Sequence, residues 1–195
     1  MHQIIFIDGF SGIGKTTLAK NLFNHYKSTY IEQNMIPEFI TKDGVNEVVG
    51  REEDETLYQC MVSLIKTFCS RGYKNILALD FNGVRFREIP EDFKGYDYII
   101  LHLICDREQN IKQMKNREGG LIDIEMLERN YDRGERYKRK PLPNEYFIDV
   151  TGKSANEVFN KAKDIIDNSI SKLDYVYIKP DKKCFTDWVQ ETEQD

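Results

Sequence analysis

Eight consecutive residues have the types and spacing suited to holding a chain of phosphates. GFSGIGKT, from Gly9 to Thr16, fits the pattern GxxxxGK followed by Ser or Thr. Its glycines let the backbone turn tightly and direct N–H groups toward phosphate oxygens, while Lys15 reaches the terminal phosphates and the Thr16 hydroxyl ligates Mg²⁺. The pattern predicts binding of ATP and Mg²⁺ through Gly9, Ser11, Gly12, Ile13, Gly14, Lys15, Thr16 and Thr17.

The segments on both sides of this loop have the patterns that a phosphate site requires. Residues 4–7 are a short β-branched apolar run, typical of a buried strand. Residues 15–27 predict a helix with Leu18, Leu22 and Phe23 on one face. A helix that begins at the loop adds the positive end of its dipole to the site. A strand, a phosphate loop and a helix are therefore expected in succession.

Three acidic residues are candidates for the metal site and for the proton acceptor. Asp80 ends a second apolar run, residues 75–80, and is expected to hold Mg²⁺ or its waters together with Thr16. Glu32 and Glu38 lie in YIEQNMIPEF, which follows a weaker strand pattern. Any of the three acids could act as general base toward a hydroxyl acceptor. A substrate that arrives as a phosphate has less need of a base and more need of cations.

The remainder of the chain alternates between strand and helix patterns, which predicts one α/β domain around a parallel sheet. Strands are expected at residues 29–32, 75–80, 98–105 and 146–150, and helices at residues 53–71, 106–117, 123–139 and 154–170. Ser154 and Glu157 form a capping pattern at the start of the last helix. Residues 34–52 contain Pro37, Gly44 and Gly50, which predicts a long loop or a broken helix.

Composition narrows the classes of function. The net charge of −5 argues against a non-specific nucleic-acid binder, because such proteins present a basic surface. No apolar run approaches the roughly 18 residues of a membrane helix, and no basic leader precedes the first apolar run. The four cysteines have no metal-type spacing. We expect a cytoplasmic protein with no membrane partner; the sequence leaves a homodimer open.

The stretch IIFIDGFSGIGKTTLAKNL resembles the opening of small P-loop kinases that phosphorylate nucleosides and nucleotides, in particular thymidylate kinases and deoxynucleoside kinases. HLICDREQNIKQMKNREGG and YFIDVTGKSANEVFNKAKDII are similar to later segments of these enzymes. The resemblance covers about residues 3–170. It implies a three-layer P-loop NTPase fold in residues 1–170, with a five-stranded parallel sheet and a small helical lid at about 117–140. Residues 171–195 are expected to be an appendage or tail.

The resemblance also implies roles for residues outside the loop. Arg117 is placed at the edge of the lid, and Tyr58, Gln59 and Phe81 lie where such enzymes place base-contacting residues. Arg129, Arg133 and Arg136 fall three and four residues apart and share one helix face, which suits stabilisation of a phosphoryl group. Arg117 and Arg133 are the stronger catalytic candidates and Arg129 a substrate contact. The alternatives are a solvated basic helix face and, for Gln59, an exposed helix residue.

Two departures from the family pattern keep the acceptor unresolved. The sequence Asp80-Phe81-Asn82 lacks the arginine that usually follows the acid, and the acid after the second strand has no clean match. The leading hypothesis is ATP- and Mg²⁺-dependent phosphoryl transfer to a nucleoside or nucleoside monophosphate. The alternatives are a kinase for a non-nucleotide hydroxyl, such as a sugar, an antibiotic or a polynucleotide end, and a nucleotide-binding regulatory NTPase.

Overall fold

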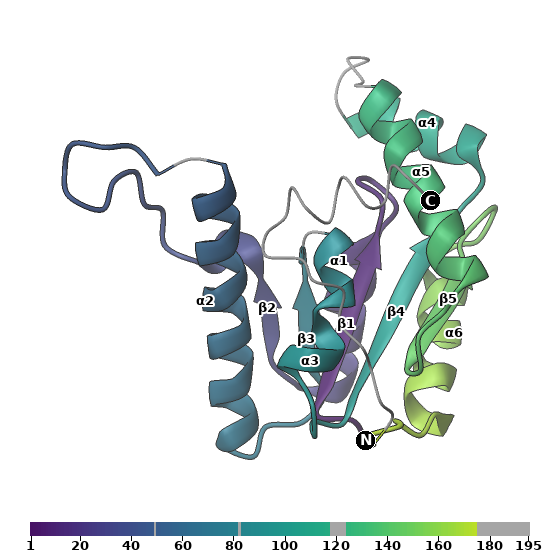
Figure 1. Ribbon diagram of the computed structural model, residues 1–195. Helices are drawn as coiled ribbons and strands as arrows, with labels where there is room; N and C mark the ends of the chain where they lie inside the picture. Colours follow the sequence, from purple (N-terminus) through teal and green to yellow (C-terminus); the bar gives the residue numbers. More distant parts are fainter. Residues whose placement is uncertain (49, 82, 118–123, 175–195) are drawn as a thin grey trace.

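The apolar runs form one five-stranded parallel sheet in the order β2-β3-β1-β4-β5 (Figure 1). Its strands are β1 (Ile4–Gly9), β2 (Tyr30–Glu32), β3 (Ile76–Leu79), β4 (Tyr98–Ile104) and β5 (Glu145–Asp149). The computed structural model describes residues 1–48, 50–81, 83–117 and 124–174. In the central strand, Ile4 pairs with Ile76 of β3 and with Tyr98 of β4. Because all strands are parallel, their carboxyl ends meet at one edge of the sheet.

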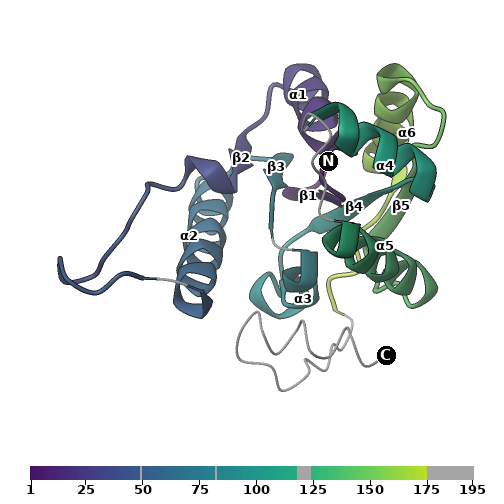
Figure 2. The same ribbon diagram turned by 90° about the horizontal axis from the view of Figure 1, so that it is seen from above.

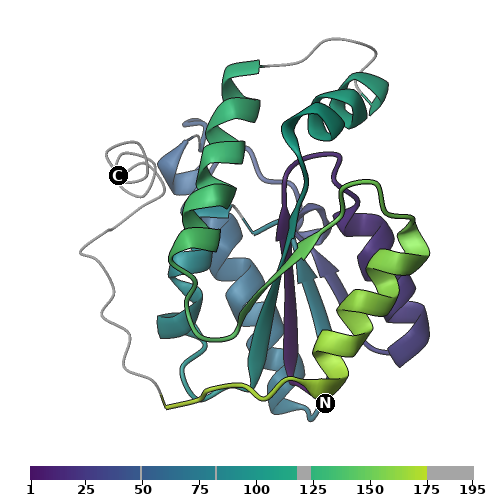
Figure 3. The same cartoon turned by 90° about the vertical axis from the view of Figure 1, so that its right-hand side faces the viewer.

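Helices cover both faces of the sheet and make a three-layer structure. Figure 2 shows α1 (Lys15–Tyr26) and α6 (Ala155–Asn168) on one face, and α2 (Arg51–Ser70) and α3 (Ile89–Asp92) on the other. In Figure 3, α5 (Ile124–Arg139) lies on the side opposite α6. Helix α4 (Arg107–Arg117) follows β4 at the carboxyl edge (Figure 1). This arrangement brings the loop after β1 and the acids after β2 and β3 to the same edge.

Burial on both faces explains why β1 has an unbroken apolar run. Ile5 and Ile7 belong to the core under α1 and α6, whereas Ile4 and Phe6 belong to the core under α2 and α3. The ring of Phe6 meets other aromatic rings edge-on, with centroids 5.1 Å away at Phe93. Alternate side chains therefore bury apolar area in two separate cores, and this rigid strand carries the phosphate loop at its end.

Every strand and helix expected from the sequence has a counterpart, and the expected α/β fold is confirmed. Helix α2 begins at Arg51, two residues before the expected start, and the capping box of Ser154 and Glu157 is present. Neither η2 (Gly83–Arg87), a 3₁₀ turn, nor α3 was predicted from the sequence. Both are too short for helical periodicity to identify them. Within the described residues, no helix is long and apolar enough to span a membrane.

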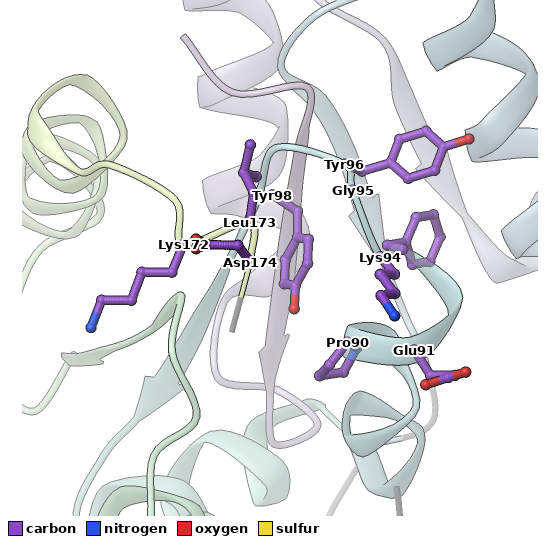
Figure 4. A pocket seen from close by; sticks show the side chains of 10 residues that line it. Pro90, Glu91, Lys94, Gly95, Tyr96, Tyr98, Lys172, Leu173 and Asp174 are labelled. Carbon is purple, nitrogen blue, oxygen red and sulfur yellow. The ribbon is translucent and has the colours of Figure 1, made fainter. Parts of the chain in front are cut away.

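The amino edge of the sheet is closed by polar contacts. His2 Nδ1 lies 2.6 Å from Asp97 Oδ1, and Ser171 Oγ donates to the same oxygen. The amide of Lys172 donates to Asn144 Oδ1 at 2.7 Å, so the chain stays against the sheet beyond residue 170. A cavity of about 360 Å³ lies at this edge, lined by residues 90, 91, 93–96, 98 and 172–174 (Figure 4). Most of the predicted appendage, from residue 175, lies outside the described residues.

Candidate active site

The loop between β1 and α1 has several positions with positive φ. Glycine adopts this backbone conformation without strain, and other residues rarely do. Gly9 has φ +148°, and a Cβ there would lie 2.9 Å from the carbonyl oxygen of Leu103. Gly12 and Gly14 have φ +77° and +106°. Gly14 immediately precedes α1 and provides no side-chain cap for the helix. The first turn of α1 therefore has no cap from this residue, which is the arrangement that favours an anion at a helix N-terminus.

Lys15 is held directly over this loop. Its Nζ donates to the carbonyl oxygens of Gly9, at 2.9 Å, and Phe10, at 3.2 Å. The same atom lies 3.8 Å from Asp80 Oδ1. Only 16 % of the Lys15 side chain is exposed, so its charge acts in a partly dry environment. The ammonium group is therefore fixed between the phosphate loop and the end of β3.

Asp80 adopts a left-handed backbone conformation, with φ +57°. Asp and Asn adopt this conformation more readily than most residues, and strained backbone is common at functional sites. The residue follows β3 directly and is half-buried. Its position beside Lys15 matches the sequence-based expectation that it lies across from the phosphate loop; its role as a metal ligand stays a prediction.

Glu32, at the end of β2, lies next to Thr16 of the phosphate loop. The Thr16 hydroxyl donates to Glu32 Oε1 at 3.4 Å, and the Tyr30 hydroxyl donates to Oε2 at 2.8 Å. Burial raises the pKa of Tyr30, and the negative charges of Glu32 and Asp80 raise it further. Tyr30 therefore remains a hydrogen-bond donor that holds the Glu32 carboxylate in place. The sequence left Glu32 and Glu38 as alternatives, and the structure brings Glu32 to the loop.

The oxygen atoms in this cluster are chemically suited to Mg²⁺. Mg²⁺ takes hard oxygen ligands and is usually held by one or two carboxylates together with substrate phosphates. The Thr16 hydroxyl and the carboxylates of Glu32 and Asp80 are ligands of this type. Among the described residues, no group of three or more His, Cys, Asp or Glu side chains could hold a metal by itself. The donor set therefore fits a metal that shares its coordination with bound phosphates.

A cavity of about 440 Å³ adjoins the cluster on the side of α2. It is lined by Gln33, Asn34, Ile36, Pro37, Glu38, Phe39, Glu53, Leu57 and Asp80. Asp80 thus contributes both to the wall of this cavity and to the surroundings of Lys15. Glu38 is exposed and lines the same cavity. We refer to this space as the larger cavity.

A second space, the smaller cavity, lies on the opposite side of the loop between α1, α4 and α6. It measures about 180 Å³ and is lined by Ile13, Gly14, Thr17, Leu18, Gln109, Gln113, Val150, Lys153, Ala155 and Val158. Gln113 Oε1 is buried without a hydrogen-bond partner among the described residues. An unpaired buried acceptor is costly unless a donor reaches it. The smaller cavity is therefore lined by three residues of the predicted phosphate site and by Gln113, whose enclosed Oε1 lacks a hydrogen-bond partner among the described residues.

Two predicted substrate contacts lie away from both cavities. Gln59 is exposed, and its amide donates to Glu55 Oε1 at 2.9 Å. Phe81 is 5 % exposed, and its ring packs edge-on against Phe6 and Tyr58. Tyr58 is itself buried and donates to Asp92. In this structure Phe81 and Tyr58 are core residues; contact of Phe81 or Gln59 with a substrate stays a prediction.

The predicted lid arginines fall on the two helices above the carboxyl edge. Arg117 ends α4, and Arg129, Arg133 and Arg136 lie within α5. The positions of these four side chains lie outside what the structure describes, so their roles stay predictions. Gly134 of α5 touches the phosphate loop closely, because a Cβ there would lie 2.8 Å from Phe10 Cζ. Helix α5 is therefore packed directly onto the loop.

A buried ionic network beneath the loop was not predicted from the sequence. His102 Nδ1 of β4 lies 2.8 Å from Oδ2 of Asp8, the residue before Gly9. His102 Nε2 faces Glu145 Oε1 at 3.5 Å, and Arg87 Nη1 donates to that oxygen at 2.8 Å. Burial alone would lower the pKa of His102, but the two carboxylates raise it to about 9. The signal that could have identified it is a histidine inside the apolar run YIILHLIC.

Arg85 is a second buried cation that the sequence did not identify. Its side chain is almost completely buried, and its guanidinium donates to Asp54, Glu55 and Glu88. The guanidinium also lies over the ring of Tyr58, at 4.5 Å. Its charge is therefore balanced by its own acidic partners between η2 and α2. Arg85 is distant from the phosphate loop in the sequence.

Solved structures with a similar fold include proteins named as kinases. A gluconokinase from Sinorhizobium meliloti 1021 has a TM-score of 0.61 at 15% identity, over 82% of this chain and 89% of that chain. A tunicamycin resistance protein from Deinococcus radiodurans has 0.60 at 17%, over 88% and 99%. A thymidylate kinase from Candida albicans has 0.51 at 15%, over 85% and 91%.

No protein-family model and no curated protein sequence matches the chain. The likeness is therefore one of fold: the chain has the α/β fold of P-loop kinases, with the five-stranded parallel sheet flanked by helices. The similar structures include a gluconokinase, a sugar kinase and a thymidylate kinase. Their different names leave the acceptor to be argued from the site.

Proposed function

We propose that this protein is an ATP- and Mg²⁺-dependent phosphotransferase that acts on a small-molecule acceptor. The observation that carries the proposal is the position of Lys15, which lies between the phosphate loop and Asp80, with a cavity on either side of the loop. Phosphoryl transfer depends mainly on positioning and on electrostatic stabilisation of the equatorial oxygens. The fixed ammonium group of Lys15, beside the N–H donors at the start of α1, supplies both the positioning and the electrostatic stabilisation.

The smaller cavity is assigned to the nucleoside part of ATP. It begins at Gly14 and Thr17, where the phosphate chain would leave the loop. Gln113 Oε1 offers a buried acceptor for an exocyclic amino group of the base. Apolar side chains from Ile13, Leu18 and Val158 line the same space and suit a flat aromatic ring. The triphosphate then runs toward Lys15 and the acids beyond it.

Mg²⁺ is assigned to the oxygen atoms next to Thr16. The Thr16 hydroxyl donates to Glu32, and Asp80 Oδ1 lies 3.8 Å from Lys15 Nζ. When bound, the metal supplies neutralisation of charge on the phosphate oxygens. Thr16 and Asp80 were the expected ligands, and the contact with Thr16 adds Glu32 to this set.

Asp80 is also the acid best placed to receive the proton of an acceptor hydroxyl. Of the three acids named from the sequence, Asp80 both lines the larger cavity and lies beside Lys15. Glu32 is engaged by Thr16 and Tyr30, and Glu38 is exposed on the outer part of the cavity wall. A hydroxyl group in the larger cavity would therefore reach Asp80 on the side that faces the phosphate loop.

The acceptor of the leading hypothesis is a nucleoside or nucleoside monophosphate, which follows from the resemblance of the loop region. A second candidate is a non-nucleotide hydroxyl, such as a sugar or an antibiotic. The similar folds of a gluconokinase and a tunicamycin resistance protein favour including it. The missing arginine after Asp80 supports the same candidate.

Release of ADP in the presence of a panel of acceptors tests the proposal. Purified protein with ATP and Mg²⁺ should release ADP much faster with the right nucleoside, monophosphate, sugar or antibiotic than without any acceptor. A rate that no compound in a broad panel increases would contradict the proposed transferase activity and favour a regulatory NTPase.

A further inference from the structure

The wall of the larger cavity carries negative charge from three separate segments. Glu38 follows η1 (Gln33–Met35), Glu53 lies in the first turn of α2, and Asp80 follows β3. No Lys or Arg is present among the described residues that line this cavity. An acidic residue in the first turn complements a helix dipole, which accounts for Glu53. That effect does not account for Glu38 and Asp80, which lie outside the helix.

Three cations whose side chains the structure describes are already balanced by other groups. Arg85 is 1 % exposed and is enclosed by Asp54, Glu55 and Glu88. Lys42 forms an ion pair with Glu52. Lys15 faces the loop carbonyl oxygens and approaches Asp80 from the side of the phosphate loop. Lys15 offsets the charge of Asp80, so among the described side chains the negative charge of the cavity wall comes mainly from Glu38 and Glu53.

A phosphate ester in this cavity would be repelled. Two like charges about 4 Å apart weaken binding by roughly five-fold in water-like surroundings and by several hundred-fold near a protein surface. A phosphate monoester carries close to two negative charges at neutral pH. Placed beside Glu38 and Glu53, it would meet this repulsion from both carboxylates, and less from Asp80, whose charge Lys15 offsets.

The rest of the cavity wall suits the uncharged part of a ligand. Ile36, Pro37, Phe39 and Leu57 provide an apolar side, and the amides of Gln33 and Asn34 provide hydrogen-bond donors and acceptors. Pockets of this kind combine apolar surface with a few polar groups that fix orientation. An amino group on the ligand would be attracted by Glu38 and Glu53.

We propose that the acceptor is a hydroxyl compound that carries no phosphate and is neutral or positively charged. The hydroxyl oxygen attacks the γ-phosphorus of ATP, the bond to the β–γ bridging oxygen breaks, and ADP leaves; the hydroxyl proton passes to Asp80. This inference rests on the proposed function and narrows its acceptor: nucleosides, sugars and amino-substituted compounds are retained, and nucleoside monophosphates are not.

The experiment compares each acceptor with its own phosphate ester. Nucleosides with their monophosphates, sugars with sugar phosphates, and amino sugars with their phosphates are each supplied with saturating ATP and Mg²⁺, and ADP release is measured. We expect kcat/KM for the phosphate-free member to exceed that of the ester by at least about tenfold. Preference for an ester would overturn the inference and leave the proposed function standing. Stimulation by no compound would instead overturn the proposed function, and the inference with it.

A charge-neutralising variant tests the cause of the preference. The double variant Glu38→Gln with Glu53→Gln should lower KM for the phosphate ester by roughly fivefold or more and should raise KM for an amino-bearing acceptor. Glu91→Gln is the matched control, because Glu91 is exposed at the amino edge of the sheet. Thermal melting of both variants checks that they fold. Equal KM changes in the control, or none in the double variant, would contradict the electrostatic explanation.

Discussion

The two cavities beside the phosphate loop differ in the charge of the residues that line them. The larger cavity has three carboxylates and no lysine or arginine among its described lining residues. The smaller cavity has Lys153, two glutamine side chains and no acid in its lining. The smaller cavity is lined by Gly14 of the loop and by Thr17, and the larger cavity is lined by Asp80, whose Oδ1 lies 3.8 Å from Lys15 Nζ. Under the proposed function, this asymmetry gives transfer a direction from the smaller cavity to the larger, because a polyphosphate is repelled less by a lining with Lys153 and no acid.

Substitution of Lys15 should have the largest effect, because it removes the charge that lies between the two cavities. Lys15→Ala should reduce kcat by at least about a hundredfold, since loss of a group aimed at transition-state charge has this size of effect. The thermal melting midpoint should stay near that of the wild type, because Lys15 contacts loop carbonyls and not the apolar core. Lys20→Ala, on the exposed face of the same helix, is the control. Turnover that survives in Lys15→Ala would contradict the assignment of the loop.

Asp80→Asn should have the next largest effect and should act at the boundary of the larger cavity. Asn also tolerates positive φ, so the backbone at φ +57° is retained. We expect kcat to fall by about a hundredfold or more with a smaller change in acceptor KM. The amount of Mg²⁺ needed for half-maximal rate separates the two roles: a rise indicates a metal ligand, and an unchanged value indicates the proton acceptor. An unchanged kcat would refute both.

Gln113→Leu should affect the smaller cavity alone. The change removes an acceptor that has no partner among the described residues, so the folded protein should be no less stable. KM for ATP should rise by roughly tenfold, the cost of one hydrogen bond, while KM for the acceptor stays the same. Lys115→Ala, exposed on the same helix, serves as control. A shift in acceptor KM with no shift in ATP KM would reverse our assignment of the two cavities.

The buried network of His102 should affect stability and leave the difference between the cavities unchanged. Its pKa is raised from 6.5 to about 9, so protonated His102 stabilises the folded state. This contribution, roughly 3 kcal/mol, is complete below pH 6.5 and is lost as the pH rises through about 9. Urea unfolding across this pH range should show a loss of unfolding free energy in the wild type that is absent in His102→Gln. The same loss in both proteins would show that His102 is not the group responsible.

Local patterns were sufficient to predict the sheet, most helices and the phosphate loop. The run from Ile4 to Ile7 is buried on both faces, and Gly9, Gly12 and Gly14 occupy positions with positive φ. Both features depend on residues close together in the sequence. The position of Asp80 beside Lys15 also follows from local pattern, because parallel strands end at one edge.

What the sequence did not reveal depends on residues that only the fold brings together. Asp8 and His102 are 94 residues apart, and Arg87 and Glu145 are 58 apart. The larger cavity brings together Glu38, Glu53 and Asp80. Considered by itself in the sequence, Glu53 is an ordinary acidic residue at the start of a helix. The ring contacts of Phe81 with Phe6 and Tyr58 were likewise not visible in the sequence, and its contact with a substrate stays a prediction. Charge and burial at such positions are properties of the assembled sheet and helices.

The most direct test follows the γ-phosphate itself. Protein is incubated with ATP labelled in the γ-phosphate, Mg²⁺ and a phosphate-free hydroxyl compound that stimulates ADP release, and the labelled products are separated. We expect the label on the acceptor in amounts equal to the ADP formed, and we expect Lys15→Ala to form neither product. Label found only in inorganic phosphate, with or without the acceptor, would contradict transfer from one cavity to the other.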